Sequence, residues 1–124
     1  MGQRILIAED DYDLRVIVSD FLTTSGYSVM AVPNGSDALD VMPALQPQLL
    51  ILDFSMPKMD GWSVLAQLRA RAETQDLPII AFTAHALSED QEKARLAGCD
   101  GFITKPFNPN DLLNEIRRLL PPAA

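Results

Sequence analysis

Five short apolar runs recur along the 124-residue chain, and segments with helical spacing separate them. Each run has the length and the branched or aromatic composition of a β-strand. Several runs are apolar at consecutive positions, which is typical of parallel strands covered by helices on both faces. The predicted strands are Ile5–Ala8, Val29–Val32, Leu49–Leu52, Ile79–Phe82 and Phe102–Thr104.

The separating segments carry apolar residues three and four positions apart, which is the spacing of one helix face. In the second segment Ser36 is the predicted cap, and Pro43 is predicted to mark the end of the helix. Trp62 shares a face with Leu65 and Leu68 in the third and is expected to pack on the core. The last helix is predicted to begin near Asn108 and to stop at the prolines that follow Leu120.

The fourth helical segment, about Ser88 to Ala97, offers little apolar surface. Its candidate inner face consists mainly of Leu87, Ala94 and Ala97. Because it buries little apolar area, we expect this helix to dock weakly and to be free to move.

Strands that alternate with helices predict an α/β fold with a mostly parallel sheet. The length suits one domain over residues 1–124. Right-handed crossovers leave few strand orders, and the flavodoxin-like doubly wound (βα)5 order 2-1-3-4-5 is the commonest for five strands. In such a sheet ligands bind beyond the carboxyl ends of the strands.

The chain is acidic, with 10 Lys and Arg against 17 Asp and Glu and a formal charge of −7. Nucleic acids and anionic membranes need a basic surface, so neither is an expected partner. The single cysteine, Cys99, excludes an intramolecular disulfide and is predicted to be a small apolar filler. With no signal-peptide pattern and no stretch of roughly 20 apolar residues, a cytoplasmic location is expected.

Acidic residues follow two of the predicted strands. Glu9, Asp10 and Asp11 come after the first, and Asp53 comes directly after the third. Crowded carboxylates repel, and a hard divalent cation with oxygen ligands removes that conflict. We therefore predict a Mg²⁺ site, with Mn²⁺ as an alternative, held by Glu9, Asp10, Asp53 and the backbone carbonyl of Ser55. The alternative role, capping of the first helix, suits Asp11 and Asp13 better.

Asp53 is the candidate nucleophile, because aspartate forms acyl phosphates where a metal screens the incoming charge. Thr83 and Lys105 come directly after the fourth and fifth predicted strands and belong to the same edge of the sheet. Lys105 can hold one phosphoryl oxygen by charge and Thr83 another by hydrogen bonding. An ordinary ion pair between Lys105 and Asp53 is compatible with this role.

At these residues the chain resembles the response-regulator receiver domain, the phosphoacceptor module of bacterial two-component signalling. Four stretches carry the resemblance in family order and cover essentially the whole chain: Ile5–Asp11, Leu50–Gly61, Ile79–Ala84 and Gly98–Phe107. The resemblance implies that Glu9 and Asp10 hold Mg²⁺ and that Asp53 is phosphorylated. Many members carry Asp at the position of Glu9, and this departure bears only on metal affinity.

The resemblance also assigns roles to other residues. Thr83 matches the switch hydroxyl, Phe102 the aromatic switch position, and Lys105 the lysine of the family pattern. The Lys105–Pro106 peptide matches a bond that the family holds cis. By the resemblance Ser55, at the rim of the site, tunes the phosphoryl lifetime. His85, two residues after Thr83, is predicted to lie at the same rim and to tune hydrolysis, and a role as a phosphohistidine donor is the less favoured alternative.

In that family the phosphoryl group comes from a histidine kinase or a histidine phosphotransfer protein. The resemblance implies that a downstream protein binds the face formed by helix four, strand five and helix five. The chain is expected to be a monomer or a phosphorylation-dependent dimer, and the sequence leaves these two alternatives open. The resemblance implies a signalling domain rather than an enzyme, with only self-catalysed phosphotransfer and autodephosphorylation. The chain is expected to be a stand-alone regulator without an output domain; the alternative is a receiver excised from a hybrid histidine kinase.

Rival functions are less consistent with the sequence. A flavin phosphate would be repelled by Glu9, Asp10 and Asp11, and a dinucleotide enzyme would need a Gly-rich first turn. A haloacid-dehalogenase-type phosphatase expects a second Asp two residues after its nucleophile, where Ser55 stands. A scaffold whose output does not depend on phosphate remains as the alternative, although the complete set of site residues weighs against it.

Overall fold

The computed structural model describes residues 2–54, 61–84 and 88–121, apart from the side chain of Ser88. Strands and helices alternate along these residues. The strands are β1 (Arg4–Ala8), β2 (Ser28–Val32), β3 (Leu49–Asp53), β4 (Ile79–Thr83) and β5 (Gly101–Thr104). The helices are α1 (Tyr12–Thr24), α2 (Gly35–Leu45), α3 (Gly61–Arg69), α4 (Ser88–Ala97) and α5 (Pro109–Leu119).

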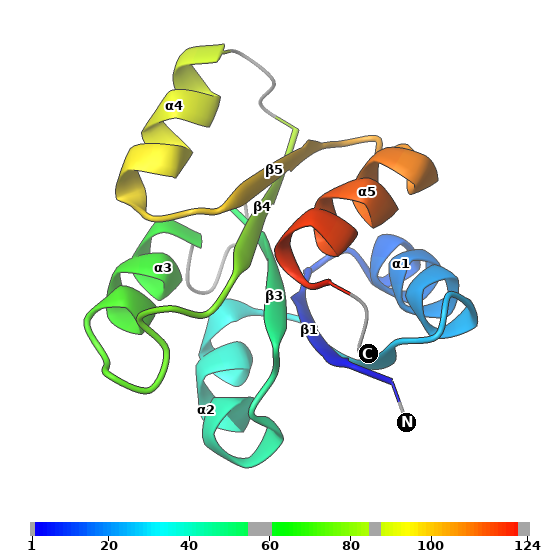
Figure 1. Ribbon diagram of the computed structural model, residues 1–124, viewed down its shortest axis with the longest axis horizontal. Coiled ribbons are helices and arrows are strands. Elements are labelled where there is room, and N and C mark those ends of the chain that lie inside the picture. The colour runs from blue at the N-terminus through cyan, green and yellow to red at the C-terminus, as the bar shows by residue number, and fades with distance from the viewer. Residues whose placement is uncertain (1, 55–60, 85–87, 122–124) are drawn as a thin grey trace.

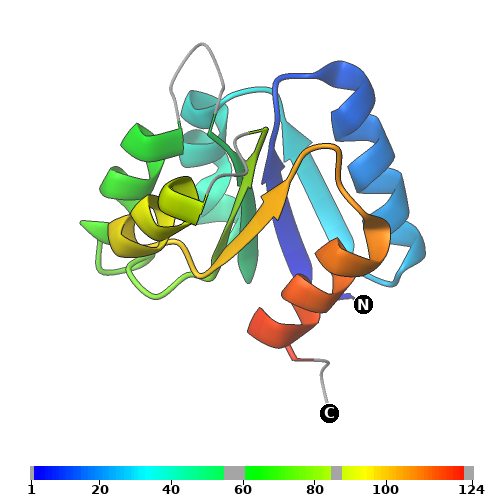
Figure 2. The same cartoon turned by 90° about the horizontal axis from the view of Figure 1, so that it is seen from above.

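The five strands form one parallel sheet in the order β2-β1-β3-β4-β5, which confirms the predicted flavodoxin-like topology. Helices α1 and α5 cover one face of the sheet, and α2, α3 and α4 cover the other (Figure 1, Figure 2). Each face has its own apolar cluster. Strands β3 and β4 lie between both clusters and are buried at every position, which explains their unbroken apolar sequence.

Each strand is one residue longer than its apolar run predicted. The extra residues include Arg4 and Ser28, which pair with each other, and Thr83, which pairs with Thr104. Backbone pairing in a sheet needs no apolar side chain, so a ladder can extend past the buried run. For the site this matters because Asp53 and Thr83 become the last residues of β3 and β4 and are held by the sheet.

Helix α2 corrects two predictions. Its cap is Asn34, whose side chain accepts a hydrogen bond from Asp37 N at 2.8 Å, and Ser36 lies inside the helix. Asn34 has the extended backbone that a capping residue needs. Pro43 lies within the helix, which continues to Leu45. A proline removes one backbone hydrogen bond, and this loss is tolerated so close to the end of the helix.

The other helices begin close to where the sequence indicated. Asp11 caps α1 by accepting from Leu14 N at 2.9 Å, and Asn108 caps α5. Helix α4 has its predicted bounds, but only part of its predicted inner face: Ala94 is buried, whereas Ala97 is exposed. Leu87 lies outside the described residues. Because 94 and 97 are three positions apart, a small rotation of the helix is enough to turn one inward and the other outward.

Cys99 is buried in the middle of the loop between α4 and β5. Burial raises the pKa of its thiol to about 12, in agreement with the predicted role as an apolar filler.

Within the described residues, no helix has the length and apolar character that crossing a membrane requires.

Candidate functional site

The predicted site residues meet at one edge of the sheet. Ala8 pairs with Leu52 between β1 and β3, and Asp53 pairs with Phe82 between β3 and β4. The same register runs on to β5, since the backbone N–H of Lys105 donates to Thr83 O at 2.8 Å. Parallel strands all end on the same side, so residues at their carboxyl ends are brought together from separate parts of the sequence.

Three carboxylates form the centre of this edge. One carboxylate oxygen from each of Glu9, Asp10 and Asp53 lies within 4.8 Å of the others. Glu9 and Asp53 are fully buried, and Asp10 is exposed. An all-oxygen cluster with one solvent-facing member suits a hard divalent cation that keeps some of its water.

Lys105 places an ammonium group between the two buried carboxylates. Its Nζ lies 2.7 Å from Glu9 Oε1 and 3.1 Å from Asp53 Oδ2. The same Nζ lies 5.1 Å from the centre of the Phe82 ring, so an aromatic face adds to its stabilisation. One ammonium against three carboxylates leaves the cluster with a formal charge of −2.

The pKa values respond to this imbalance. Burial raises the pKa of Glu9 to about 7, although Lys105 and the backbone N–H of Asp11 act in the opposite direction. Burial acts to raise the pKa of Asp10 as well, but hydrogen bonds with Asp53 and Glu9 outweigh it and place the pKa below its ordinary value. A cluster that holds a proton near neutral pH is one that a divalent cation would stabilise.

Lys105 responds in the opposite sense. Burial acts to lower its pKa, but the hydrogen bond to Glu9 and the charge of Asp53 outweigh burial and raise the pKa above its ordinary value. The ammonium therefore stays charged through the physiological range. The peptide bond from Lys105 to Pro106 is cis, which is the geometry that the resemblance implied.

Hydrogen bonds in the turn from β1 to α1 hold both the backbone and the side chain of Glu9. Glu9 N donates to Val32 O at 3.0 Å, and Glu9 Oε2 accepts from Asp11 N at 3.0 Å. Arg15 on α1 reaches back and donates from Nη1 to the carbonyl oxygen of Glu9 at 2.9 Å. Glu9 therefore points into the site while Asp11 caps the helix.

A cavity of about 350 Å³ adjoins the site on the side of α4. Thr83 and Phe102 both line it, so the residues proposed from sequence as switch hydroxyl and switch aromatic border the same space. Its other lining residues come from α3, α4 and the end of β3: Phe54, Trp62, Asp90, Lys93 and Ala94. Ser55 and His85, predicted to lie at the rim, fall outside the described residues.

The chain also matches a known protein family over most of its length. The profile of the response regulator receiver domain matches residues 5–117. The chain belongs to this family. A related protein, response regulator Rre1 of Synechocystis sp. strain PCC 6803, is 36% identical over 117 residues, which are 94% of this chain and 51% of that protein. The receiver domain thus spans about half the length of several curated relatives that it matches.

Solved structures agree with this assignment. The chemotaxis protein CheY4 of Vibrio cholerae superimposes with a TM-score of 0.90 at 28% identity, covering 97% of this chain and all of that one (100%). The receiver domain of the sensor histidine kinase PA1611 of Pseudomonas aeruginosa superimposes with a TM-score of 0.87 at 31% identity and covers 96% of this chain and 98% of that one. That structure is described as having a magnesium ion coordinated in the active site cleft.

Two features of this receiver domain were not found from its sequence. Arg15 was not singled out, and no local signal connects an arginine on a helix to a carbonyl six residues earlier. The approach of Lys93 on α4 to Trp62 on α3, with Nζ 4.9 Å from the ring centre, was not foreseen either. Both depend on how one element lies against another.

Proposed function

We propose that this receiver domain accepts a phosphoryl group on Asp53 in a two-component phosphorelay. The observation that carries the proposal is the position of Asp53, which is fully buried at the end of β3 with Lys105 Nζ at 3.1 Å and the carboxylates of Glu9 and Asp10 beside it. The donor is a phosphohistidine of a histidine kinase or of a histidine phosphotransfer protein.

In the transfer, the phosphorus–nitrogen bond of the donor breaks and phosphorus bonds to a carboxylate oxygen of Asp53. The bonding electron pair returns to the imidazole nitrogen, and the product is an acyl phosphate. Such a transfer depends on positioning and charge neutralisation rather than on covalent help from other groups. Lys105 supplies an ammonium at the reacting carboxylate, and Thr83 supplies a hydroxyl at the neighbouring strand end.

Glu9, Asp10 and Asp53 would hold Mg²⁺, or Mn²⁺ in its place, with the carbonyl of Ser55 as a further ligand. When bound, the ion neutralises charge on the phosphoryl oxygens. The raised pKa of Glu9 and the all-oxygen character of the cluster support this assignment. The magnesium ion described for the PA1611 receiver domain supports it as well.

The conformational change that follows phosphorylation is proposed to involve the cavity that Thr83 and Phe102 line. Phosphorylation adds nearly two negative charges and strong acceptor oxygens at Asp53, which draw the Thr83 hydroxyl toward them. Space is then freed beneath α4, Phe102 turns into it, and the face of α4, β5 and α5 changes. A downstream protein, or a second copy of the chain, that binds only the changed face shifts the population toward it.

The domain is proposed to act as a switch rather than as an enzyme with an external substrate. It catalyses its own phosphorylation and dephosphorylation only. One relative is named a DNA-binding transcriptional regulator, and this chain corresponds to 48% of it. The formal charge of −7 favours protein rather than DNA as the direct contact of the receiver domain.

Intact-protein mass spectrometry after incubation with acetyl phosphate tests the proposal. We expect one phosphoryl adduct that requires Mg²⁺ and is absent from Asp53→Asn. No adduct in a folded protein under any condition would favour the scaffold whose output does not depend on phosphate. An adduct that persists in Asp53→Asn would place the acceptor elsewhere.

A further inference from the structure

Helix α4 is attached to the molecule unevenly along its length. Of its described side chains only Ala94 is buried, while Leu96 is 72% exposed. Apolar burial therefore contributes little to its position, as the sequence indicated. Polar contacts at its carboxyl end and near its middle also hold it, and these differ in kind.

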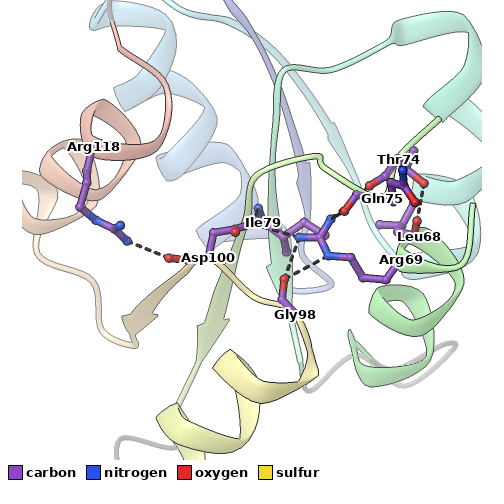
Figure 3. A network of polar contacts seen from close by, with 8 residues as sticks. All are labelled: Leu68, Arg69, Thr74, Gln75, Ile79, Gly98, Asp100 and Arg118. Atoms are coloured by element: carbon purple, nitrogen blue, oxygen red, sulfur yellow. Dashed lines mark hydrogen bonds and ion pairs between the residues drawn. The ribbon is translucent and has the colours of Figure 1, made fainter. Parts of the chain in front are cut away.

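The carboxyl end of α4 is held by Arg69, the last residue of α3 (Figure 3). Arg69 donates from Nε and Nη2 to Gly98 O, at 3.1 and 2.7 Å, directly after the helix ends. Its Nη1 donates to Thr74 O and to Gln75 O, each at 3.1 Å. One half-buried guanidinium therefore joins the end of α4 to α3 and to the loop that leads into β4.

Asp100 extends this attachment to β4 and α5 (Figure 3). Its Oδ2 accepts from Arg69 Nη2 at 3.0 Å and from Ile79 N at 2.9 Å. Its carbonyl oxygen accepts from Arg118 Nη2 on α5 at 2.8 Å. Gly98 O accepts two hydrogen bonds from one planar guanidinium, and Asp100 is held by Arg69, Ile79 and Arg118, so we expect the segment 98–100 to resist displacement.

Near its middle α4 reaches across the cavity to α3 through Lys93. Lys93 Nζ lies 4.9 Å from the centre of the Trp62 ring. Trp62 in turn packs edge-on against Phe54, with ring centroids 4.5 Å apart. Lys93 is exposed, and a cation–aromatic contact open to water is weak. Thr83 and Phe102 line the cavity under this contact.

We propose that α4 pivots about its carboxyl end, which Arg69 holds at Gly98. The contact of Lys93 with the ring of Trp62 is the latch that holds the helix across the cavity. The latch favours the position of α4 in the unphosphorylated protein. A change at Thr83 alters the space beneath the latch, so the amino-terminal half of α4 moves while its carboxyl end stays in place. The link to phosphorylation rests on the proposed function, but the latch itself does not.

Lys93→Gln tests the latch, with Arg95→Gln as a matched control. The control removes the same charge from the same helix, but Arg95 is paired with Glu92 on the surface rather than with Trp62. In the unphosphorylated protein, we expect amide hydrogen exchange in residues 88–97 to become roughly two- to fivefold faster in Lys93→Gln, as loss of an exposed cation–aromatic contact implies. Exchange in α1 and α5 should stay unchanged.

The only tryptophan of the chain gives a second readout. Quenching of Trp62 fluorescence by acrylamide should increase in Lys93→Gln and stay unchanged in Arg95→Gln. Arg69→Gln should instead accelerate exchange at residues 98–100 as well as in α4. Unchanged exchange and quenching in Lys93→Gln, or equal changes in the control, would overturn the latch. If amide exchange at residues 98–100 stayed as slow in Arg69→Gln as in the wild type, the fixed carboxyl end would be overturned.

The coupling to phosphorylation is measured as the rate of adduct formation with acetyl phosphate and Mg²⁺. If the latch opposes the phosphorylated arrangement, Lys93→Gln should react roughly two- to fivefold faster than Arg95→Gln. Faster exchange with an unchanged rate would show that the contact is structural and not part of the switch. If the wild-type protein forms no adduct, the proposed function fails, while the exchange and quenching results still decide whether the latch exists.

Discussion

The two buried carboxylates of the site differ in how the protein stabilises them. Lys105 Nζ lies closer to Glu9 than to Asp53, at 2.7 against 3.1 Å, and yet burial keeps the pKa of Glu9 near 7. One ammonium therefore does not compensate both charges. In the absence of metal, a proton on Glu9 is the simplest way to remove the excess negative charge.

This imbalance predicts that the metal-free protein loses stability as pH rises. A carboxyl whose pKa is about 7 when folded and 4.5 when unfolded binds more protons in the folded state, so its contribution is present at low pH and lost as pH rises through 7. Between pH 5.5 and 7.5 the free energy of unfolding should fall by about 1–2 kcal/mol from this group. Urea unfolding in EDTA at both pH values measures the loss.

Glu9→Gln is the control for this pH dependence. The amide cannot titrate. Between pH 5.5 and 7.5 the free energy of unfolding of the variant should therefore fall by about 1–2 kcal/mol less than that of the wild type, whatever its absolute stability. Equal pH dependence in wild type and Glu9→Gln would mean that Glu9 is not the titrating group.

At the scale of the elements, the start of α2 contains two residues of types that commonly cap helices, and only one of them is the cap. Asn34 and Ser36 are both good capping residues, but only the Asn34 side chain is placed to accept from the helix backbone, at Asp37 N. Asn34→Ala should lower the free energy of unfolding by about 1 kcal/mol, while Ser36→Ala changes it by less than about 0.5 kcal/mol. Thermal unfolding of the two variants compares them directly, and a larger effect at Ser36 would contradict the assignment.

The end of α4 allows a similar comparison between two glycines. Gly98 and Gly26 both have positive φ, 115° and 104°, so alanine is strained at either position. An added Cβ at Gly98 would lie 3.1 Å from Arg69 Nε, whereas at Gly26 it would meet nothing within 4 Å. Gly26→Ala should cost about 1–2 kcal/mol and Gly98→Ala more, because it also displaces Arg69.

Chemical denaturation of the two glycine variants gives the difference between their free energies of unfolding. The additional loss in Gly98→Ala should largely disappear when Arg69 is already replaced by Gln, since the clash and the displaced contacts are then shared. Additive losses in the double variant would mean that Gly98 and Arg69 act independently.

At the scale of the whole molecule, the sequence predicted the site better than it predicted the contacts around it. The strand-end rule placed Glu9, Asp53, Thr83 and Lys105 together, because parallel strands in a known order leave little choice of where their ends lie. The contact of Lys93 with Trp62 has no such rule. It depends on the position of α4, which buries little apolar surface, relative to α3, whose apolar face is buried in the core, and that position emerges from the packing of the whole chain.

The site also connects the fold as a whole to metal binding. Its carboxylates come from the turn after β1 and from the last residue of β3, and the unfolded chain does not hold them together. A cation that binds only the folded state stabilises it by about 1.4 kcal/mol for each tenfold excess over its Kd. We therefore expect the free energy of unfolding to rise with the logarithm of Mg²⁺ concentration, and most of the pH-dependent loss assigned to Glu9 to disappear.

Asp10→Asn and Asp20→Asn separate specific binding from a general effect of salt. Both remove one negative charge from an exposed position, but Asp20 lies on α1 outside the acidic cluster. The Mg²⁺-dependent stabilisation should be lost in Asp10→Asn and retained in Asp20→Asn, measured by urea unfolding at constant ionic strength. Retention in Asp10→Asn would mean that the ion acts through the general negative charge of the protein, because screening of a −7 surface does not depend on which of the two exposed carboxylates is removed.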